Sequence, residues 1–340
     1  MAVLVTGGAG YIGSFVLRAL ETRGLDAVVL DDLSTGHRRA AEGWPLEVFS
    51  CGDTDRVAAL MERAGIDAVI HLAALSIVGD SVREPERYWR HNVGGAEGLL
   101  AACRRAGVRR FVLSSTAAVY GEPSRVPIPE EHPLAPTNPY GATKVEIERR
   151  LAEAQAADGL GWAALRYFNA AGAMPDGSLG EDHPVETHLI PLALRAAAGA
   201  GAGAAAGPED GAAAELTVFG NDWPTPDGTC LRDYVHVLDL ARAHVLALGW
   251  LDAHPGGALV CNLGGGQGTS VRQVLDAVHE ATGREVPHRI GPRREGDPAV
   301  LVAAVGRAAT ELGWRPERSE IGTVVKDAWA WEQTRRSGPA

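Results

Sequence analysis

A tyrosine and a lysine, Tyr140 and Lys144, lie four positions apart in a segment that reads Tyr-Gly-Ala-Thr-Lys. Residues with this spacing share one face of a helix, so the phenol and the ammonium group would be neighbours. A free phenol has a pKa of about 10 and is a poor base at neutral pH. A nearby positive charge favours the phenolate, so the pair indicates a general acid/base with Tyr140 as the proton-transferring group. Taken alone, the same spacing favours a packed phenol beside a solvated lysine.

Hydroxyl groups end a predicted strand upstream of this pair, in the run Ser114-Ser115-Thr116. A Thr116 hydroxyl beside Tyr140 would hold a substrate hydroxyl between two hydrogen-bonding groups. This run supports the catalytic interpretation of Tyr140, Lys144 and Thr116 over the packed-phenol interpretation.

Glycines follow the first predicted strand directly, in the run Gly7-Gly8-Ala9-Gly10-Tyr11-Ile12-Gly13. Such a loop allows a tight turn and a close approach of the backbone to a pyrophosphate, which lies on the N-terminal amides of the next helix. Asp31 follows Gly13 by eighteen residues, at the end of the second predicted strand, where an acid binds the adenosine ribose diol of a dinucleotide. Because this carboxylate would repel a 2′-phosphate, we predict NAD rather than NADP as the cofactor.

Asp53, after the third predicted strand, has two interpretations. Its carboxylate could bind the adenine amino group of the dinucleotide, or it could cap the helix that begins near Arg56. The residues themselves do not decide between these two roles.

The elements that must position these groups alternate between short apolar strands and amphipathic helices. Strands are predicted over 2–6, 27–31, 47–50, 68–72, 111–114 and 163–167, and helices over 12–23, 56–63, 93–105 and 143–157. Near-continuous apolar strands are typical of a parallel sheet buried on both faces. The pattern predicts an α/β fold with a Rossmann-like, doubly wound parallel sheet.

The alternation ends after Asn169. A loop rich in Gly, Pro, Asp and Ser covers 172–183, and an Ala/Gly-rich stretch at 196–214 is expected to be a surface insertion. A strand–helix unit near 233–248 and 258–263 is expected to rejoin the sheet. Residues 1–169 with about 232–262 are therefore assigned to the NAD-binding domain. Residues of about 170–231 and 263–340, including 271–281 and 321–331, are assigned to a smaller mixed α/β lobe.

Composition excludes several classes of protein. Of 340 residues, 43 are Asp or Glu and 32 are Lys or Arg, and the net charge of −11 argues against a nucleic-acid or membrane-surface partner.

The four cysteines, Cys51, Cys103, Cys230 and Cys261, form no CxxC pair and are expected to be reduced thiols of a cytoplasmic protein. No signal peptide and no membrane span are expected. The histidines, including His71, His183, His188 and His236, lack a spacing such as HExxH, and no metal site is predicted.

Several longer segments resemble one family. From residue 1 to about 331 the chain is similar to the extended short-chain dehydrogenase/reductases, and among them to the UDP-glucose 4-epimerases. The segments that carry this resemblance are Val-Thr-Gly-Gly-Ala-Gly-Tyr-Ile-Gly-Ser at 5–14, Pro-Tyr-Gly at 139–141, Leu-Arg-Tyr-Phe-Asn at 165–169, Phe-Gly-Asn-Asp at 219–222, Leu-Arg-Asp-Tyr-Val-His-Val at 231–237 and Arg-Arg-Glu-Gly-Asp at 293–297.

The resemblance implies a set of site residues. Tyr140 would be the acid/base, Lys144 would bind the nicotinamide ribose and Tyr167 would pack at the nicotinamide end. The remaining implied NAD-binding residues are Gly7, Gly10, Tyr11, Ile12 and Gly13 at the pyrophosphate, Asp31, Asp32, Ser34, Thr35 and Gly36 at the ribose, Asp53 and Thr54 at the adenine, and Leu72, Ala73, Ala74, Ser76, Asn92 and Ser114 along the middle of the cofactor. The implied substrate-binding residues are Thr116, Asn169, Leu189, Thr217, Phe219, Arg232, Arg294, Asp297 and Leu301.

Two positions depart from the pattern of some relatives. Ser76 stands where they carry Lys, which removes one phosphate contact, and Thr116 stands where they carry Ser, which keeps the hydroxyl. Arg232 and Arg294 agree with a diphosphate ligand, because guanidinium groups bind adjacent phosphates bidentately.

The resemblance implies an isomerase that interconverts UDP-galactose and UDP-glucose through oxidation at carbon 4, a 4-keto sugar and return of the hydride to the opposite face. Leu301 stands where relatives restricted to the plain sugars carry Tyr, so UDP-N-acetylhexosamines are an expected further substrate class. The alternative is that Leu301 packs as an ordinary core residue and that neighbouring side chains close the pocket. A homodimer through helices near 93–105 and 146–157 is also implied. The alternatives are another nucleotide-sugar epimerase or a dehydratase, which Ala117-Ala118 after Thr116 disfavours, and a non-catalytic NAD-binding sensor.

Overall fold

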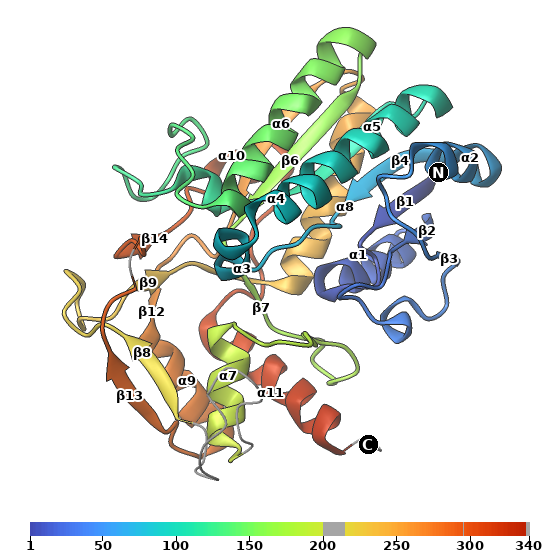
Figure 1. Cartoon of the computed structure of the whole chain (residues 1–340). Coiled ribbons are helices and arrows are strands. Elements are labelled where there is room, and N and C mark those ends of the chain that lie inside the picture. Colours follow the sequence, from blue (N-terminus) through green and yellow to red (C-terminus); the bar gives the residue numbers. More distant parts are fainter. Residues whose placement is uncertain (200–214, 295, 338–340) are drawn as a thin grey trace.

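A computed structural model of the chain describes residues 1–199, 215–294 and 296–337. It contains a large parallel sheet covered by helices on both faces and a smaller lobe beside the carboxyl ends of the strands (Figure 1). Most of the predicted insertion at 196–214 lies outside the described residues. No helix in the described ranges combines the length and apolarity needed to cross a bilayer.

The large sheet has seven strands in the order β11-β6-β5-β4-β1-β2-β3, and all its pairings are parallel. From β1 the chain adds β2 and β3 on one side and then β4, β5, β6 and β11 on the other. Such a reversal places ligand sites at the carboxyl ends of the central strands. The strands are β1 (Ala2–Thr6), β2 (Asp26–Leu30), β3 (Leu46–Glu47), β4 (Ile66–His71), β5 (Arg110–Thr116), β6 (Gly161–Tyr167) and β11 (Ala258–Leu263).

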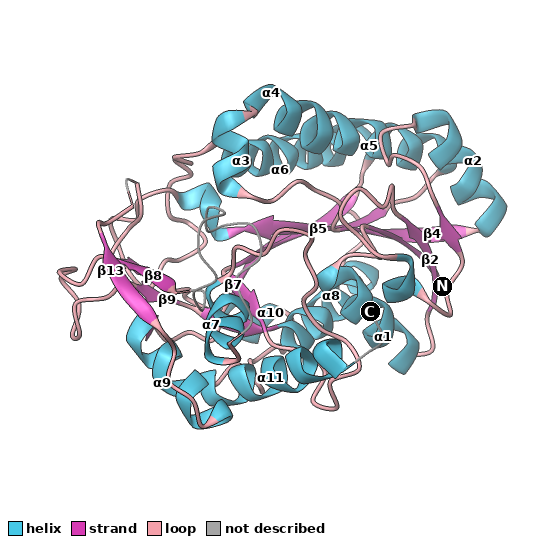
Figure 2. Cartoon of the chain, turned by 60° about the horizontal axis from the view of Figure 1, so that its bottom comes forward, coloured by secondary structure: helices cyan, strands magenta, loops and turns pink. Residues whose placement is uncertain are grey.

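Helices cover both faces of this sheet (Figure 2). One face packs against α1 (Tyr11–Thr22) and α8 (Val237–Ala253) and the other against α2 (Thr54–Ala64), α5 (Gly95–Ala106) and α6 (Pro139–Asp158). Successive strand residues point to opposite faces, so Val3 and Val5 belong to the first core and Leu4 to the second. The apolar pattern of the strands thus reflects two buried layers, and the predicted doubly wound α/β fold is confirmed.

Short helical segments lie between these elements. They are a 3₁₀-helix η1 (Arg38–Ala41), α3 (Val78–Arg83), α4 (Pro85–Tyr88), a π-helix η2 (Trp89–Gly94) that leads into α5, a second 3₁₀-helix η3 (Ala117–Tyr120) and α10 (Gly306–Glu311).

The smaller lobe mixes short strands and helices. Its strands form three small sheets, which pair β7 (Asn169–Ala171) with β10 (Tyr234–His236), β9 (Leu231–Arg232) with β12 (Thr269–Ser270) and β14 (Val300–Leu301), and β8 (Leu216–Phe219) with β13 (His288–Gly291). Its helices are α7 (Leu189–Ala197), α9 (Val271–Thr282) and α11 (Ile321–Ser337). They share a separate hydrophobic core that includes Ile190, Val274 and Val324.

Several elements differ from those predicted. The third strand has only two residues rather than four. The unit near 233–263 returns to the large sheet through β11 alone, because β10 pairs with β7 instead. Helix α6 begins four residues earlier than predicted, since Asn138 caps it by accepting the Gly141 amide at 2.9 Å and Pro139 occupies its first turn. Tyr140 and Lys144 therefore both lie near the start of α6.

Candidate active site

The glycine loop between β1 and α1 packs tightly against the loop after β4. Gly7 has φ of +74°, and a Cβ atom there would lie 2.6 Å from the Ala73 backbone nitrogen. A Cβ atom on Gly13 would lie 2.2 Å from the Gly7 carbonyl oxygen. Gly10 caps α1 without a side chain, which leaves the N-terminal amides of α1 free to bind an anion. Gly7 and Gly13 are thus required by the turn, and the turn forms a cradle for a pyrophosphate.

Asp31 follows β2 and lies beside this loop. Its carboxylate accepts the Ala9 amide at 3.0 Å and the Leu33 amide at 2.9 Å, and the residue is 8% exposed. Burial raises the pKa of this carboxyl, and the two backbone hydrogen bonds oppose that rise. The carboxylate is therefore held in place at the position where a ribose diol would bind.

Most of the predicted NAD-binding residues line one continuous pocket. It runs from the glycine loop to the start of α6, and the predicted residues in its wall are Gly7, Gly10, Tyr11, Ile12, Gly13, Asp31, Asp32, Ser34, Thr35, Leu72, Ala73, Ala74, Ser76, Thr116, Tyr140, Lys144 and Tyr167. The structure thus joins the dinucleotide loop to the tyrosine, lysine and threonine in one cavity.

Five predicted NAD-binding residues lie outside this lining, namely Gly36, Asp53, Thr54, Asn92 and Ser114. Asp53 caps α2 by accepting the Arg56 amide at 3.2 Å, so the capping role is present. Thr54 donates its hydroxyl to the Gly98 carbonyl at 3.1 Å. Gly36 packs against Ala9, whose carbonyl oxygen would lie 2.9 Å from an added Cβ atom. For these residues contact with the cofactor stays a prediction.

Asn92, in the π-helix η2, has its amide group fully occupied. Its Oδ1 accepts the Leu75 amide at 2.8 Å, and its Nδ2 donates to the Leu75 carbonyl at 3.0 Å and to the Thr143 hydroxyl at 3.2 Å. Asn92 therefore ties the pocket loop after β4 to helix α6, and its contact with the cofactor stays a prediction.

Tyr140, Thr116 and Tyr167 converge at the inner end of the pocket. Burial and the neighbouring Tyr167 raise the pKa of the Tyr140 phenol, and the interaction with the Thr116 side chain opposes that rise. Lys144 is 2% exposed, and its Nζ donates to the Ser114 carbonyl oxygen at 2.7 Å rather than to Tyr140. Burial lowers the pKa of Lys144 to about 8, and Glu148 on the next turn opposes that shift. The phenol is thus held neutral by the protein itself.

A buried histidine that the sequence analysis did not single out supports this end of the pocket. The His244 Nδ1–H group faces the Leu240 carbonyl oxygen at 2.8 Å, which leaves Nε2 to accept from the Ser114 hydroxyl at 2.8 Å. The Ser114 hydroxyl also forms a hydrogen bond with Tyr167 and lowers its pKa, although burial raises that pKa to about 12. Ser114 therefore positions Tyr167 and Lys144. No local sequence motif points to His244, because it comes from α8.

A second pocket lies in the smaller lobe and collects most of the predicted substrate-binding residues. Its wall includes Asn169, Leu189, Thr217, Phe219, Arg232, Arg294 and Asp297. Asn169 and His188 line both this pocket and the first one, so the two cavities meet at these residues. His188 and Arg289 of this wall were not predicted, although Arg289 adds a third guanidinium group to the site.

Arginines in the second pocket are partly pre-positioned. Arg232 donates from Nη1 to the Leu231 carbonyl at 2.9 Å and to the Pro298 carbonyl at 3.0 Å, and its Nη2 lies 3.6 Å from Asp297. The Arg294 guanidinium lies 3.8 Å from the centre of the Phe219 ring. The convergence of Arg232 and Arg294 predicted from the sequence is therefore present, and these groups suit a phosphorylated ligand with a flat ring.

Leu301 lies outside the lining of both pockets. It pairs with Arg232 in the β14–β9 register and packs against a hydrophobic cluster that includes Val119, Ile128 and Phe168. Phe168 in turn lines the first pocket. Any effect of Leu301 on the ligand must therefore pass through Phe168 or through the β9 strand.

The residues present fit a bound dinucleotide. The fixed Asp31 carboxylate, the glycine cradle and the buried Tyr140 all line one cavity, as an adenosine ribose, a pyrophosphate and a reactive ring would require. Proton transfer at Tyr140 beside such a ring is the chemistry that the geometry supports.

Comparisons with known proteins agree with this arrangement. The model of the NAD dependent epimerase/dehydratase family matches residues 3–264. A UDP-glucose 4-epimerase of Corynebacterium glutamicum is 48% identical over 331 residues, which cover 97% of this chain and 95% of the relative.

Solved structures show the same similarity. The crystal structure of UDP-glucose 4-epimerase from Brucella ovis in complex with NAD is 47% identical, with a TM-score of 0.90 and coverage of 96% of this chain and 97% of that one. A UDP-glucose-4-epimerase from Stenotrophomonas maltophila with bound NAD and formylated UDP-arabinopyranose is 40% identical, with a TM-score of 0.92 and coverage of 99% of both chains. The chain therefore belongs to the NAD-dependent epimerase/dehydratase family.

Proposed function

We propose that the protein is an NAD-dependent isomerase that interconverts UDP-galactose and UDP-glucose at carbon 4 of the hexose. The observation that carries the proposal is the junction of the two pockets. Asn169 and His188 line both cavities, so a sugar attached to a diphosphate held by Arg232 and Arg294 can extend toward Tyr140 and Thr116. The relatives described above are named UDP-glucose 4-epimerases, which is the activity proposed here.

The chain's own residues account for the proton transfers. Thr116 and Tyr140 bind the hydroxyl on carbon 4, and the Tyr140 oxygen takes its proton and later returns one. NAD, when bound in the first pocket, supplies the hydride acceptor and donor and places a positive ring beside the phenol. That positive charge matters because burial alone raises the pKa of Tyr140. Lys144, held by the Ser114 carbonyl, positions its ammonium group against the cofactor ribose.

Epimerisation also requires tight binding of the diphosphate and weak binding of the hexose. The guanidinium groups bind the diphosphate tightly, because bidentate contacts to phosphates are strong and directional. A sugar that pivots about its link to the diphosphate can then present either face of carbon 4 to the same ring. The net redox change is zero, so the cofactor recycles in place.

A dehydratase is the second candidate, and the residues after Thr116 disfavour it. Ala117 and Ala118 begin the 3₁₀-helix η3, and Ala117 packs against the cluster that contains Val119 and Phe168. Methyl groups cannot exchange the protons that elimination at neighbouring carbons requires. A non-catalytic sensor is the third candidate, and it has no need for Tyr140 and Thr116 in hydrogen-bond contact.

Acceptance of UDP-N-acetylhexosamines is part of the same proposal. Leu301 has no phenol ring, and it packs against the hydrophobic cluster that includes Phe168, which lines the first pocket. A leucine fills less of the space around this cluster than a tyrosine would, which supports acceptance of an N-acetyl group.

We also propose a cytoplasmic homodimer, on the basis of the family resemblance. The two helices in question, α5 and α6, are joined within the chain by an ion pair between Glu97 and Arg150 at 3.0 Å. Light scattering of the purified chain tests this proposal, because a monomer at micromolar concentration would contradict it.

Incubation of the purified protein with UDP-galactose, without added NAD, tests the function. We expect UDP-glucose to form and no net NADH to accumulate. The Tyr140→Phe variant serves as the control for contaminating activity. Formation of a 4-keto-6-deoxy sugar would support the dehydratase, and the absence of any product with NAD bound would support the sensor.

A further inference from the structure

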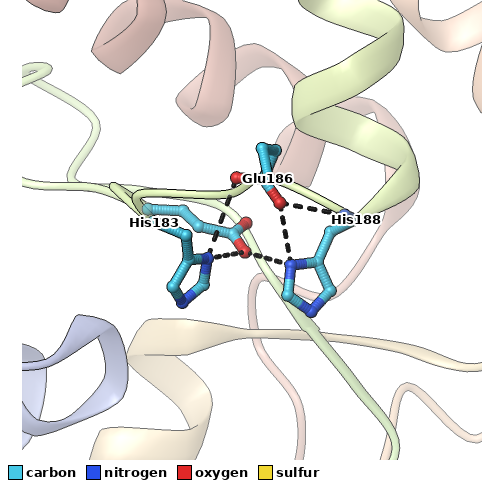
Figure 3. Close-up of side chains that lie close together, drawn as sticks. His183, Glu186 and His188 are labelled. Carbon is cyan, nitrogen blue, oxygen red and sulfur yellow. Dashed lines mark hydrogen bonds and ion pairs between the residues drawn. The ribbon is translucent and has the colours of Figure 1, made fainter. Parts of the chain in front are cut away.

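Four potential metal ligands lie together in the loop between β7 and α7. They are Glu181, His183, Glu186 and His188, and one ligand atom from each lies within 4.8 Å of every other (Figure 3). The two histidines lack an HExxH spacing, so no metal site was predicted from them. The signal in the sequence is instead the compact run Glu-x-His-x-x-Glu-x-His at 181–188.

The distances within this cluster fit ligands that share one ion. His183 Nδ1 lies 3.1 Å from Glu181 Oε1 and 3.8 Å from Glu186 Oε2. His188 Nδ1 lies 2.7 Å from Glu181 Oε1 and 2.9 Å from Glu186 Oε1. Two ligands on a tetrahedral zinc ion are ~3.4 Å apart, since bonds of about 2.0–2.1 Å meet near the tetrahedral angle. The observed separations lie on both sides of that value.

Two buried atoms of the cluster lack hydrogen bonds. His183 Nδ1 and Glu186 Oε2 each have no hydrogen-bond partner, and the Glu186 side chain is only 1% exposed. Buried polar atoms normally find a partner, so these two call for a ligand or an ion between them. The two atoms face each other at 3.8 Å, which is too long for a hydrogen bond.

The two carboxylates require positive charge close by, which protons on His183 and His188 or a metal ion at the centre can supply. The side chains of Glu181 and Glu186 are 6% and 1% exposed, and burial of a carboxylate without compensation is costly. The nearest guanidinium, Arg195, stays 3.8 Å from Glu186 Oε2 and also faces Glu332. A divalent ion at the centre would neutralise both carboxylates.

We propose that Glu181, His183, Glu186 and His188 bind one zinc ion. Four protein ligands without an open position are typical of structural zinc sites, whereas Ca²⁺ takes six to eight oxygen ligands and Mg²⁺ requires octahedral oxygen coordination. Glu186 Oε1 already accepts the amides of Thr187 and His188 at 2.8 and 2.9 Å, which orients the carboxylate as outer-shell hydrogen bonds orient metal ligands.

The ion would connect the two pockets of the active site. The His183 ring packs edge-on against Tyr11 of the glycine loop, with ring centres 6.2 Å apart, and His188 lines both cavities. In Figure 3 the second nitrogen of each ring points away from the carboxylates. Ligation through Nδ1 keeps the proton on Nε2, so each histidine stays a hydrogen-bond donor. Zinc would thus fix the loop that separates the cofactor from the substrate.

Direct metal binding tests the proposal without reference to turnover, so its outcome is separate from that of the epimerase assay. The tag-free full chain is treated with a chelator, dialysed and titrated with ZnCl₂ against a chromophoric zinc indicator. We expect one zinc ion per chain and a higher Tm with zinc than without. Replacement by Co²⁺ should give the visible absorption of a tetrahedral site.

Variants locate the ion. His183→Gln and Glu186→Gln should weaken zinc binding by more than ~100-fold, beyond the loss typical of outer-shell changes. His279→Gln is the matched control, because His279 and Glu285 form an exposed pair at 3.4 Å elsewhere on the chain. Circular dichroism of each variant establishes that it is folded.

Two results would overturn the proposal. One is a wild-type chain that binds no zinc after chelator treatment, which would mean that protons on the histidines balance the carboxylates. The other is binding that survives in a folded variant lacking both His183 and Glu186, or that is lost in His279→Gln alone.

Discussion

The Nζ atom of Lys144 lies 2.7 Å from the carbonyl oxygen of Ser114, the residue at which β5 approaches the pocket. The ammonium group is therefore held by the backbone of the sheet, one helical turn from Tyr140. The tyrosine hydroxyl is bound by Thr116 instead. This division supports the proposal that Tyr140 and Thr116 act at the reacting hydroxyl and that Lys144 positions the cofactor.

Replacement of Tyr140 by Phe should reduce kcat by about 10²-fold or more, because the group that exchanges the proton is lost. Bound NAD and the circular dichroism spectrum should stay unchanged. Tyr88→Phe is the matched control, since this buried tyrosine donates to the Ile77 carbonyl at 2.7 Å and packs in the same cluster as Tyr140. Near-wild-type turnover in Tyr140→Phe would remove Tyr140 from its role.

Replacement of Asp31 by Ser should weaken NAD retention and reduce discrimination against NADP. The ribose diol loses its acceptor, and the repulsion of a 2′-phosphate disappears. The measurement is the ratio of the Kd values of the two dinucleotides. Asp26→Ser, at the exposed start of the same strand, is the control. An unchanged ratio in the Asp31 variant would show that the carboxylate does not face the ribose.

Replacement of Leu301 by Tyr should suppress turnover of UDP-N-acetylgalactosamine more than turnover of UDP-galactose. A ring at this position would press on Phe168, which lines the first pocket. The measurement is the ratio of kcat/KM for the two substrates in both proteins, with the exposed Leu134→Tyr as the control. A wild type without N-acetyl activity, or an equal loss on both substrates, would contradict this expectation.

Acid should destabilise the protein partly through His244. Burial lowers the pKa of this imidazole to about 4, from a value of about 6.5 in the unfolded chain. Between these values the unfolded state binds one proton more than the folded state, so the free energy of unfolding falls as pH decreases from 6.5 toward 4. The slope from this histidine is at most about 1.4 kcal/mol per pH unit.

Urea unfolding of wild type and His244→Gln from pH 7 to 4.5 measures that contribution. The variant should be less stable at pH 7, because Ser114 loses its acceptor, but its stability should fall less steeply with acid. His279→Gln, on the surface, should keep the wild-type slope. Parallel curves for wild type and His244→Gln would show that His244 is not the group responsible.

Local patterns in the sequence determined the large sheet and the cofactor site. The strands of a doubly wound sheet are buried on both faces, so their apolar runs are visible without knowledge of their partners. The glycine run and Asp31 directly follow β1 and β2, and Tyr140 and Lys144 lie near the start of α6. The order of the strands then brings these segments together at one edge of the sheet.

Tertiary structure decided the roles that depend on residues distant in the chain. His244 reaches Ser114 from 130 positions away, and Asn92 reaches Thr143 from 51 positions away. Neither contact has a local signature, because side-chain hydrogen bonds between elements depend on packing rather than on spacing. Leu301 illustrates the same limit, since only the β14–β9 pairing and the cluster around Phe168 place it behind the pocket wall. The two carboxylates and two histidines at 181–188 are adjacent in sequence, yet only the path of the loop turns all four toward one point.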